Sequence, residues 1–395
     1  MSPQDYHYLD NAATTPVDPE IAESMARALR EDYGNPSSLY PLGMHASRVL
    51  EESREILSGM LGARRIVFTG GGTESTNLAM RGQFLGGRAG ATLVGAADHP
   101  SVTETARSLS LEGHEMRVYP VDRLCHPDVE RFDALLDEDL RFVSILYGNN
   151  EVGTLPELST LVDLVRKKAP RAHVHVDAVQ AFCKVPLDLD RLGVDSATVA
   201  AHKIHGPKGV GALALGNKKQ PTPLITGGGQ EMGMRSGTEN VCGIRAMVQA
   251  AELWISRMSE VRQRHLDWRK QLLDTLDEAG CEHHLLGDPE VRLANVISLA
   301  FPGVAGEVAM NHLAERGLYV STGSACSQRG EPAGKSARKK EARTGSRILQ
   351  AMDLPPEWIQ GTLRISLGRL TQQADVDALC KELPAVVQLL RELGL

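Results

Sequence analysis

The chain has 395 residues, of which 42% are hydrophobic and 24% are charged, and its formal net charge is -7 at pH 7. This composition is that of a globular protein and excludes a disordered chain, and the negative charge makes nucleic acid an unlikely partner. At this length we expect two hydrophobic cores, a large one and a small one.

The cysteine pattern and the hydropathy favour a cytoplasmic protein. The cysteines show no CxxC pair and no short regular spacing, so we expect reduced thiols instead of a disulfide framework. The "CEHH" run at 281–284 has no distant ligand partner, and we expect no metal site. No apolar run approaches the ~20 residues that span a bilayer, and we expect no signal peptide at the N-terminus. The six cysteines are Cys125, Cys183, Cys242, Cys281, Cys326 and Cys380.

The first predicted element is a helix in "VDPEIAESMARALREDYG", residues 17–34. Asp18 suits the N-cap and Pro19 suits the first turn, while Gly34 suits the end of the helix. The spacing of the apolar residues predicts one buried face, formed by Ile21, Met25, Ala28 and Leu29.

Short apolar runs then alternate with helix-like stretches as far as residue 203. This alternation predicts an α/β fold with a doubly wound parallel sheet and helices on both faces. Ligands of such sheets bind beyond the carboxyl ends of the strands. The residues that follow each strand are therefore the candidates for chemistry. The predicted strands include 65–68, 91–96, 141–147, 173–177 and 196–200.

The alternation of strand-like and helix-like stretches ends near residue 240. A long helical stretch, 239–279, is expected to connect to a second domain with strands at 295–301, 318–322 and 362–368. An amphipathic helix at 374–393 closes the chain.

One segment, Arg329 to Arg347, is rich in glycine, alanine and basic residues and lacks apolar periodicity. Such a composition predicts a mobile loop. A solvated insertion is the favoured interpretation, and a binding site for nucleic acid or an acidic protein is the alternative.

Three glycines follow the strand at 65–68 and precede Thr73. Glycines let the backbone approach an anion, and the helix that begins here can donate N–H groups to it. The absence of a following GK[ST] excludes a P-loop. A phosphate site and a tight turn are both compatible with this motif.

Four other strand ends carry polar residues: His99, the pair Asn149 and Asn150, Asp177 with Gln180, and His202 with Lys203. Each has a purely structural alternative, namely a cap, a turn or a surface position. A buried carboxylate needs a partner such as a protonated ring nitrogen. A desolvated lysine is a usable nucleophile. An anion cradle, a carboxylate and a lysine are together the parts that pyridoxal phosphate requires.

Nine motifs strengthen this interpretation. They are "YLDNAATTP", "YGNPSSLY", "FTGGGTESTNLA", "NNEVGT", "HVDAVQ", "AHKIHGPKGVGAL", "GGGQEMGMRSGTENV", "STGSAC" and "LRISLGR", between Tyr8 and Arg369. In sequence and order they resemble the cysteine desulfurases of the NifS/IscS type, which are class V aminotransferase-like enzymes that depend on pyridoxal 5'-phosphate. The resemblance implies fold type I, the aspartate aminotransferase-like fold. It implies a large domain, 14–257, with a mostly parallel seven-stranded sheet, and a smaller α/β domain, 258–395, completed by 1–13.

The resemblance also implies the roles of the cofactor-binding residues. Lys203 would carry the cofactor as a Schiff base and move the Cα proton of the substrate. Asp177 would pair with the pyridine nitrogen, His99 would stack on the ring, and Gln180 would hydrogen-bond its phenolic oxygen. The remaining cofactor contacts would come from Gly72, Thr73, Asn150, His202 and Thr238, the last reaching the partner subunit of a homodimer.

For the substrate, the resemblance implies that Asn150 and Arg364 bind the carboxylate of L-cysteine, for which an arginine fork is suited. Cys326 would accept the sulfur as a persulfide and deliver it to acceptor or scaffold proteins for iron–sulfur cluster assembly or tRNA thiolation. The alternatives are a selenocysteine lyase, an ordinary aminotransferase, and a non-catalytic binding protein with the same fold.

The sequence departs from the family pattern at three places. A serine that contacts the phosphate is replaced by Ala200 or Ala201, which removes a hydrogen bond worth roughly 1–3 kcal/mol. Tyr147 stands where the family has a histidine and could offer the site a hydrogen bond. The segment after Cys326 is lengthened by the basic insertion at 329–347.

Overall fold

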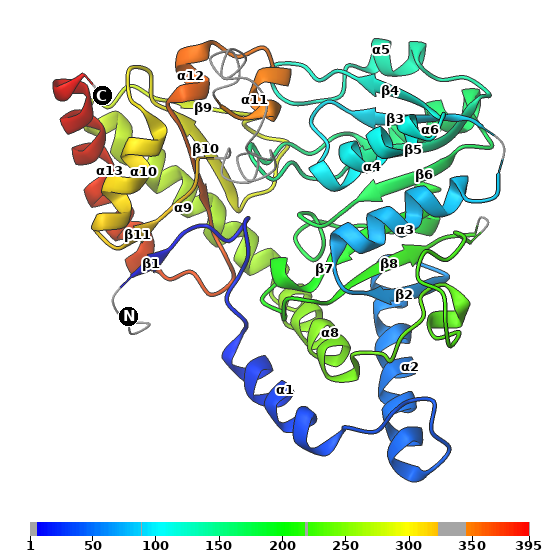
Figure 1. The fold of residues 1–395 in the computed structure, drawn as a ribbon. Coiled ribbons are helices and arrows are strands. Elements are labelled where there is room, and N and C mark those ends of the chain that lie inside the picture. The colour runs from blue at the N-terminus through cyan, green and yellow to red at the C-terminus, as the bar shows by residue number, and fades with distance from the viewer. Residues whose placement is uncertain (1–5, 88, 218–219, 323–344, 395) are drawn as a thin grey trace, which may run out of the picture.

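The computed structural model describes residues 6–87, 89–217, 220–322 and 345–394 (Figure 1). Cys326 and most of the basic segment at 329–347 lie outside the described residues.

A seven-stranded sheet forms the larger part of the molecule, with strand order β2-β8-β7-β6-β5-β3-β4. All neighbouring strands are parallel except at β8, which runs antiparallel to both β2 and β7. The predicted α/β class and mostly parallel seven-stranded sheet are confirmed. The strands are β2 (Arg65–Thr69), β3 (Ala91–Gly95), β4 (Glu115–Tyr119), β5 (Leu140–Leu146), β6 (His173–Asp177), β7 (Ser196–Ala200) and β8 (Gly211–Leu215).

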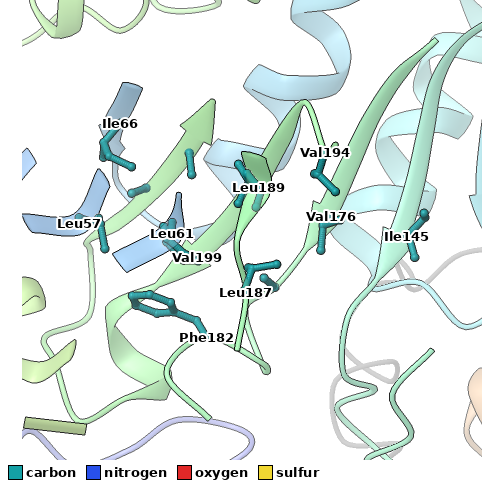
Figure 2. Packing of buried hydrophobic residues seen from close by; sticks show 14 of the residues in the cluster. Leu57, Leu61, Ile66, Ile145, Val176, Phe182, Leu187, Leu189, Val194 and Val199 are labelled. Atoms are coloured by element: carbon teal, nitrogen blue, oxygen red, sulfur yellow. The ribbon is translucent and has the colours of Figure 1, made fainter. Parts of the chain in front are cut away.

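Helices cover both faces of this sheet, which is why its central strands are buried along their whole length. One face packs against α2 (Pro41–Leu61), α6 (Leu158–Lys168) and α8 (Val241–Ile255). Figure 2 shows part of this core, where Leu57 and Leu61 of α2 lie near Ile66 and Val199 of the sheet. The other face packs against α3 (Gly72–Phe84) and α4 (Pro100–Leu111). The shorter helices are α5 (Val129–Ala134) and α7 (Leu189–Leu192), with 3-10 turns η1 (Ala201–Lys203) and η2 (Glu231–Gly233).

A second core lies at the other side of the molecule, on the left in Figure 1. It is built on an antiparallel sheet of β12 (Thr362–Ser366), β10 (Val296–Ala300) and β9 (His284–Leu285). The N-terminal strand β1 (His7–Tyr8) pairs with β11 (Leu318–Tyr319), and Leu9 is buried in this same core. The domain limits at 13/14 and 257/258 stay predictions. The helices here are α9 (Met258–Glu278), α10 (Gly306–Glu315), α11 (Arg347–Ala351), α12 (Pro356–Gln360) and α13 (Gln373–Leu393).

The helix expected at 239–279 is in fact two helices, α8 and α9, interrupted at Ser256 and Arg257. The physical reason is that the two halves are buried in different cores. Apolar residues of α8 belong to the core of the large sheet, whereas Trp268 and Leu272 of α9 belong to the second core.

The first helix, α1 (Pro19–Glu31), matches its prediction at the start and differs at its end. Asp18 caps it by accepting the N–H of Glu20 at 2.9 Å, and Ile21 and Ala28 are buried. Leu29 is 58% exposed, so the predicted buried face was wrong at this position. The helix ends at Glu31, before Gly34.

Candidate active site

Three of the predicted strand ends meet at one edge of the large sheet. Leu146 at the end of β5 pairs with Asp177 at the end of β6, and Asp177 pairs with Thr198 near the end of β7. Because these strands are parallel, the residues that follow them project from the same edge. The register therefore brings together the asparagine turn, Asp177 and the turn η1.

Asp177 is a buried carboxylate with spare hydrogen-bonding capacity. It is 4% exposed, and its Oδ1 atom accepts the backbone N–H of Val179 at 3.1 Å. Its Oδ2 atom has no hydrogen-bond donor among the described residues. Burial raises the pKa of this carboxyl, and the neighbouring His99 and Lys203 act in the opposite direction. A ligand N–H would satisfy the open oxygen.

Lys203 lies on η1, directly after β7, and it points into the molecule. Its Nζ atom donates to the carbonyl oxygens of Ala12 and Ala13, at 2.6 Å each. Lys203 is half-buried, and its ammonium group is bound by the N-terminal segment. The sequence could not assign this role to Ala12 and Ala13 because their backbone carbonyls, which any residue would carry, make the contacts.

His99 caps helix α4, which the sequence offered as its structural alternative. Its Nδ1 atom accepts the N–H of Ser101 at 3.1 Å and lies 2.8 Å from the Ser101 hydroxyl. Burial lowers the pKa of His99, which favours a neutral imidazole. The cap fixes one edge of the ring, so capping does not exclude the predicted stacking role, which stays a prediction.

The glycine run forms the start of α3. Gly71 is the N-cap and provides no side chain, and the N–H groups of Gly72 and Thr73 have no acceptor within the described residues. A Cβ atom on Gly72 would lie only 3.0 Å from Cγ2 of Val179, so the absence of a side chain is required here. Free N–H groups at the positive end of a 13-residue helix suit an anion.

Ala200 and Ala201, the two candidates for the position of the missing serine, face different neighbours. The Cβ atom of Ala200 would lie 3.9 Å from a Cβ on Gly72, whereas Ala201 faces Gly206. Ala200 is thus the residue beside the glycine cradle. His202 lies at the same end of the sheet, where its Nδ1 atom is 3.2 Å from the Thr14 hydroxyl, and burial lowers its pKa to about 4.

Arg364 reaches this edge from β12, in the second sheet. Its guanidinium donates to Asp10 Oδ1 at 2.6 Å and to the carbonyl of Asn150 at 2.9 Å. Arg364 is 5% exposed, and its Nε atom is buried without a partner among the described residues. The positioning role of Asp10 could not be predicted, because no local sequence pattern joins residues 10 and 364.

Asn149 is a turn former, since its Oδ1 atom accepts the N–H groups of Glu151 and Val152.

Gln180 and Lys203 are neighbours because their side chains donate hydrogen bonds to the same carbonyl oxygen. Its Nε2 atom donates to the carbonyl of Ala12 at 3.0 Å, the same oxygen that Lys203 contacts. Its Oε1 atom is buried and has no partner in the described part of the chain. Such an atom indicates a missing ligand group.

The structure does not bring the remaining predicted residues into this cluster. Cys326 lies outside the described residues, and Thr238 is exposed on the loop after η2. The hydroxyl of Tyr147 donates to the carbonyl of Pro186 at 3.3 Å, so the expected hydrogen bond to the site was wrong.

With this geometry established, comparison with known proteins identifies the family. The aminotransferase class-V model matches residues 7–379. The chain is 36% identical to "Cysteine desulfurase IscS 1" of Archaeoglobus fulgidus, over 98% of both chains. It is 34% identical to "Cysteine desulfurase NifS" of Azotobacter vinelandii, over 98% of this chain and 94% of the relative. The chain belongs to the class-V aminotransferases, among the cysteine desulfurases of the NifS/IscS type.

Solved structures of NifS-like proteins support the same assignment. A "NIFS-like protein" superposes with a TM-score of 0.88 at 35% identity, covering 98% of this chain and 100% of that chain. A NifS-like protein from Rickettsia africae superposes with a TM-score of 0.84 at 27% identity, covering 97% and 99%. The expected fold, fold type I, is confirmed.

Class-V aminotransferases depend on pyridoxal phosphate in general, and the residues present here fit that group. The open Oδ2 of Asp177 suits the pyridine N–H, and the orphaned Oε1 of Gln180 suits the phenolic oxygen when it carries a proton. The unpaired N–H groups at Gly72 and Thr73 suit the phosphate. The amine of Lys203 lies beside Gln180, since both side chains donate to the carbonyl oxygen of Ala12.

Proposed function

We propose that this chain is a pyridoxal-phosphate-dependent cysteine desulfurase that converts L-cysteine to L-alanine and retains the sulfur as a persulfide on Cys326. The observation that carries the proposal is the meeting of the Lys203 amine, the open carboxylate oxygen of Asp177 and the unpaired Nε of Arg364 at one edge of the sheet. An amine, a carboxylate and a guanidinium are what an amino-acid substrate and this cofactor together require.

The cofactor would be held through Lys203, Asp177, Gln180 and His99, with its phosphate on Gly72, Thr73 and His202. The proposal includes two further contacts, from Asn150 and from Thr238 of a second copy. When bound, pyridoxal phosphate withdraws electrons from the Cα of an attached amino acid and so weakens its bonds. Asp177 supports this withdrawal because a buried anion favours a protonated ring nitrogen.

Lys203 would act as the base that accepts the Cα proton. The carbonyls of Ala12 and Ala13 are placed to receive the resulting ammonium group, since they already accept two hydrogen bonds from Nζ.

Arg364 would bind the substrate carboxylate. Asp10 and the Asn150 carbonyl orient the guanidinium, and its Nε atom remains for the ligand. A guanidinium fork fixed by two such partners gives the substrate a defined orientation.

Cys326 would attack the sulfur of the substrate as a thiolate. The new S–S bond forms as the Cβ–S bond breaks, its electron pair passes to carbon, and that carbon takes up a proton on the way to alanine. The sulfur is oxidised and the carbon is reduced, so no external oxidant is needed. The chain supports this reach: Ser321 forms a backbone bridge to Arg364. Cys326 is four residues beyond Thr322, at most about 14 Å of extended chain.

The proposal includes a homodimer and sulfur-accepting partner proteins. Large apolar side chains are exposed between the end of α1 and the start of α2, at the lower edge of Figure 1. We interpret these exposed apolar side chains as the surface that a second copy covers. A cytoplasmic location also belongs to the proposal, supported by free thiols at all five described cysteines. No helix in the described ranges combines the length and the hydropathy needed to cross a membrane.

The exposed apolar side chains at the end of α1 and the start of α2 are those of Leu29, Tyr33, Leu39, Tyr40, Leu42 and Met44.

The first test measures products with purified, cofactor-loaded protein and a reductant. L-cysteine and L-selenocysteine are offered separately, and alanine is quantified with sulfide or selenide. We expect turnover of cysteine that is lost in Cys326→Ala and retained in the matched variant Cys242→Ala. Turnover confined to selenocysteine would instead assign the chain to the selenocysteine lyases, and no turnover of either would contradict the proposal.

A second test locates the cofactor. Borohydride reduction fixes the cofactor to its lysine, and peptide mapping then identifies the residue. We expect the adduct on Lys203 and its loss, together with the visible absorbance, in Lys203→Ala. An adduct on Lys208, which is exposed on the same loop, would overturn the assignment of Lys203.

A further inference from the structure

Arg347 connects α11 to the residues around His99. It is the first residue of α11, and its guanidinium donates to the carbonyl oxygen of Asp98 and, at 3.2 Å, to the hydroxyl of Thr103. These contacts span more than 240 residues of sequence.

The two acceptors bracket His99. Asp98 immediately precedes it, and the N–H of Thr103 donates to the His99 carbonyl at 3.2 Å. A guanidinium that binds both sides of one residue restrains the backbone of that residue. A planar fork can serve two acceptors at once, which an ammonium group cannot do with the same geometry.

The neighbouring residues hold α11 in the same place. The hydroxyl of Ser346 donates to the buried carboxylate of Glu151 and also caps α11 by accepting the N–H groups of Ile348 and Leu349. The side chains of Ile348 and Leu349 pack in one buried cluster with Ala97, two residues before His99. The position of Arg347 is therefore fixed by packing as well as by its own hydrogen bonds.

The charge of Arg347 is unfavourable at the start of a helix, where the macrodipole is positive. Two buried carboxyl groups offset it. Burial raises the pKa of Asp98 to about 7 and that of Glu151 to about 7, and Arg347 opposes the shift in both cases. A cation at the positive end of α11 does not stabilise that helix, so the hydrogen bonds to Asp98 and Thr103 are the contacts that indicate what Arg347 does.

We propose that Arg347 is a positioning residue that holds His99 in place over the cofactor ring from the α11 side of the site. The inference rests on the proposed function, because it assigns a ring to the space that His99 faces. Arg347 acts through Asp98 and Thr103 and is not itself placed in contact with the reacting atoms.

The test compares Arg347→Ala, Arg347→Lys and Thr103→Val with the wild type, all reconstituted with pyridoxal phosphate. Circular dichroism in the visible band reports how the ring is held, and an absorbance titration gives the cofactor dissociation constant. We expect Arg347→Ala to reduce the visible dichroism and to weaken cofactor binding about tenfold. Arg347→Lys should recover part of this loss. Thr103→Val, which removes one acceptor, should show a smaller change in the same direction.

Controls separate positioning from simple anchoring of α11. Arg131→Ala, an exposed arginine on α5, should match the wild type in every readout. If Arg347→Ala lowers the thermal midpoint but leaves dichroism and cofactor affinity unchanged, Arg347 only anchors α11 and the inference fails. If Arg347→Ala does not fold, Thr103→Val decides, and wild-type dichroism and affinity in that variant overturn the inference. Failure of the wild type to bind the cofactor would overturn the proposed function itself, a result distinct from these.

Discussion

At the scale of single residues, the site consists of ordinary side chains that are buried and keep an atom without a hydrogen-bond partner among the described residues. Asp177 is a carboxylate with one filled and one open oxygen, and Arg364 is a guanidinium with one orphaned nitrogen. The buried Nε atom of Arg364 costs free energy in the absence of a ligand, on the order of 1–3 kcal/mol. The alanine at position 200 is the opposite case, since it lies beside the cradle and offers no hydrogen bond.

The replacement of Ala200 by serine is expected to tighten cofactor binding. The added hydroxyl would face the Gly72 cradle and donate to the phosphate, a gain of about 1.4 kcal/mol or tenfold in affinity. The measurement is the dissociation constant of pyridoxal phosphate by absorbance titration. Ala201→Ser is the matched control, because Ala201 faces Gly206 and should give no gain. Equal affinities in Ala200→Ser and the wild type would show that the cradle does not hold the phosphate.

At the scale of elements, the loop that carries Thr238 depends on one buried ion pair. Glu231 and Met232 both have positive φ, at 50° and 56°, which is strained for residues other than glycine. The Glu231 carboxylate accepts hydrogen bonds from Arg54 of α2, at 2.8 and 3.1 Å, and from the N–H of Phe68 of β2. The pair thus joins three elements and holds the strained turn.

Glu231→Gln is expected to lower the free energy of unfolding by about 3 kcal/mol. The reason is that it leaves the charge of Arg54, itself largely buried, without its partner. Urea denaturation measures the change. Glu51→Gln is the matched control: Glu51 is exposed and lies 3.4 Å from the same guanidinium, so its loss should cost about 1 kcal/mol or less. Similar losses in the two variants would show that burial does not set the strength of the pair.

At the scale of the whole molecule, the polar site and the exposed apolar stretch at 29–44 lie on different parts of the chain. The site is assembled from strand ends of two sheets and from the N-terminal segment. Among the described residues, none of the hydrogen bonds that hold Lys203 and Arg364 comes from the apolar stretch. Substitutions in this stretch therefore test association with a second copy without removing a side chain of the site.

Leu39→Asp is expected to convert a dimer to a monomer. Leu39 is 92% exposed, and burying an added charge at an apolar interface is costly. Light scattering coupled to gel filtration gives the mass. Leu111→Asp, 82% exposed at the end of α4, should leave the mass unchanged. A wild type that is monomeric, or a Leu39→Asp variant that stays dimeric, would place the interface elsewhere or exclude it.

The sequence by itself determined many of the elements and the chemistry at their ends. Hydrophobic periodicity is a local property, so β6, β7 and α13 could be predicted from a few residues each. The carboxylate, lysine and glycine run at the strand ends were likewise visible as residue types.

The tertiary structure alone decided which groups meet. Strand register placed Ala200 and not Ala201 beside Gly72, and chain packing brought the Ala12 and Ala13 carbonyls to Lys203. The contacts of Arg364 with Asp10, and of Arg347 with Asp98, join residues far apart in the sequence. Such contacts leave no local pattern, because they depend on how whole layers pack, and a backbone carbonyl carries no residue identity that a sequence could reveal.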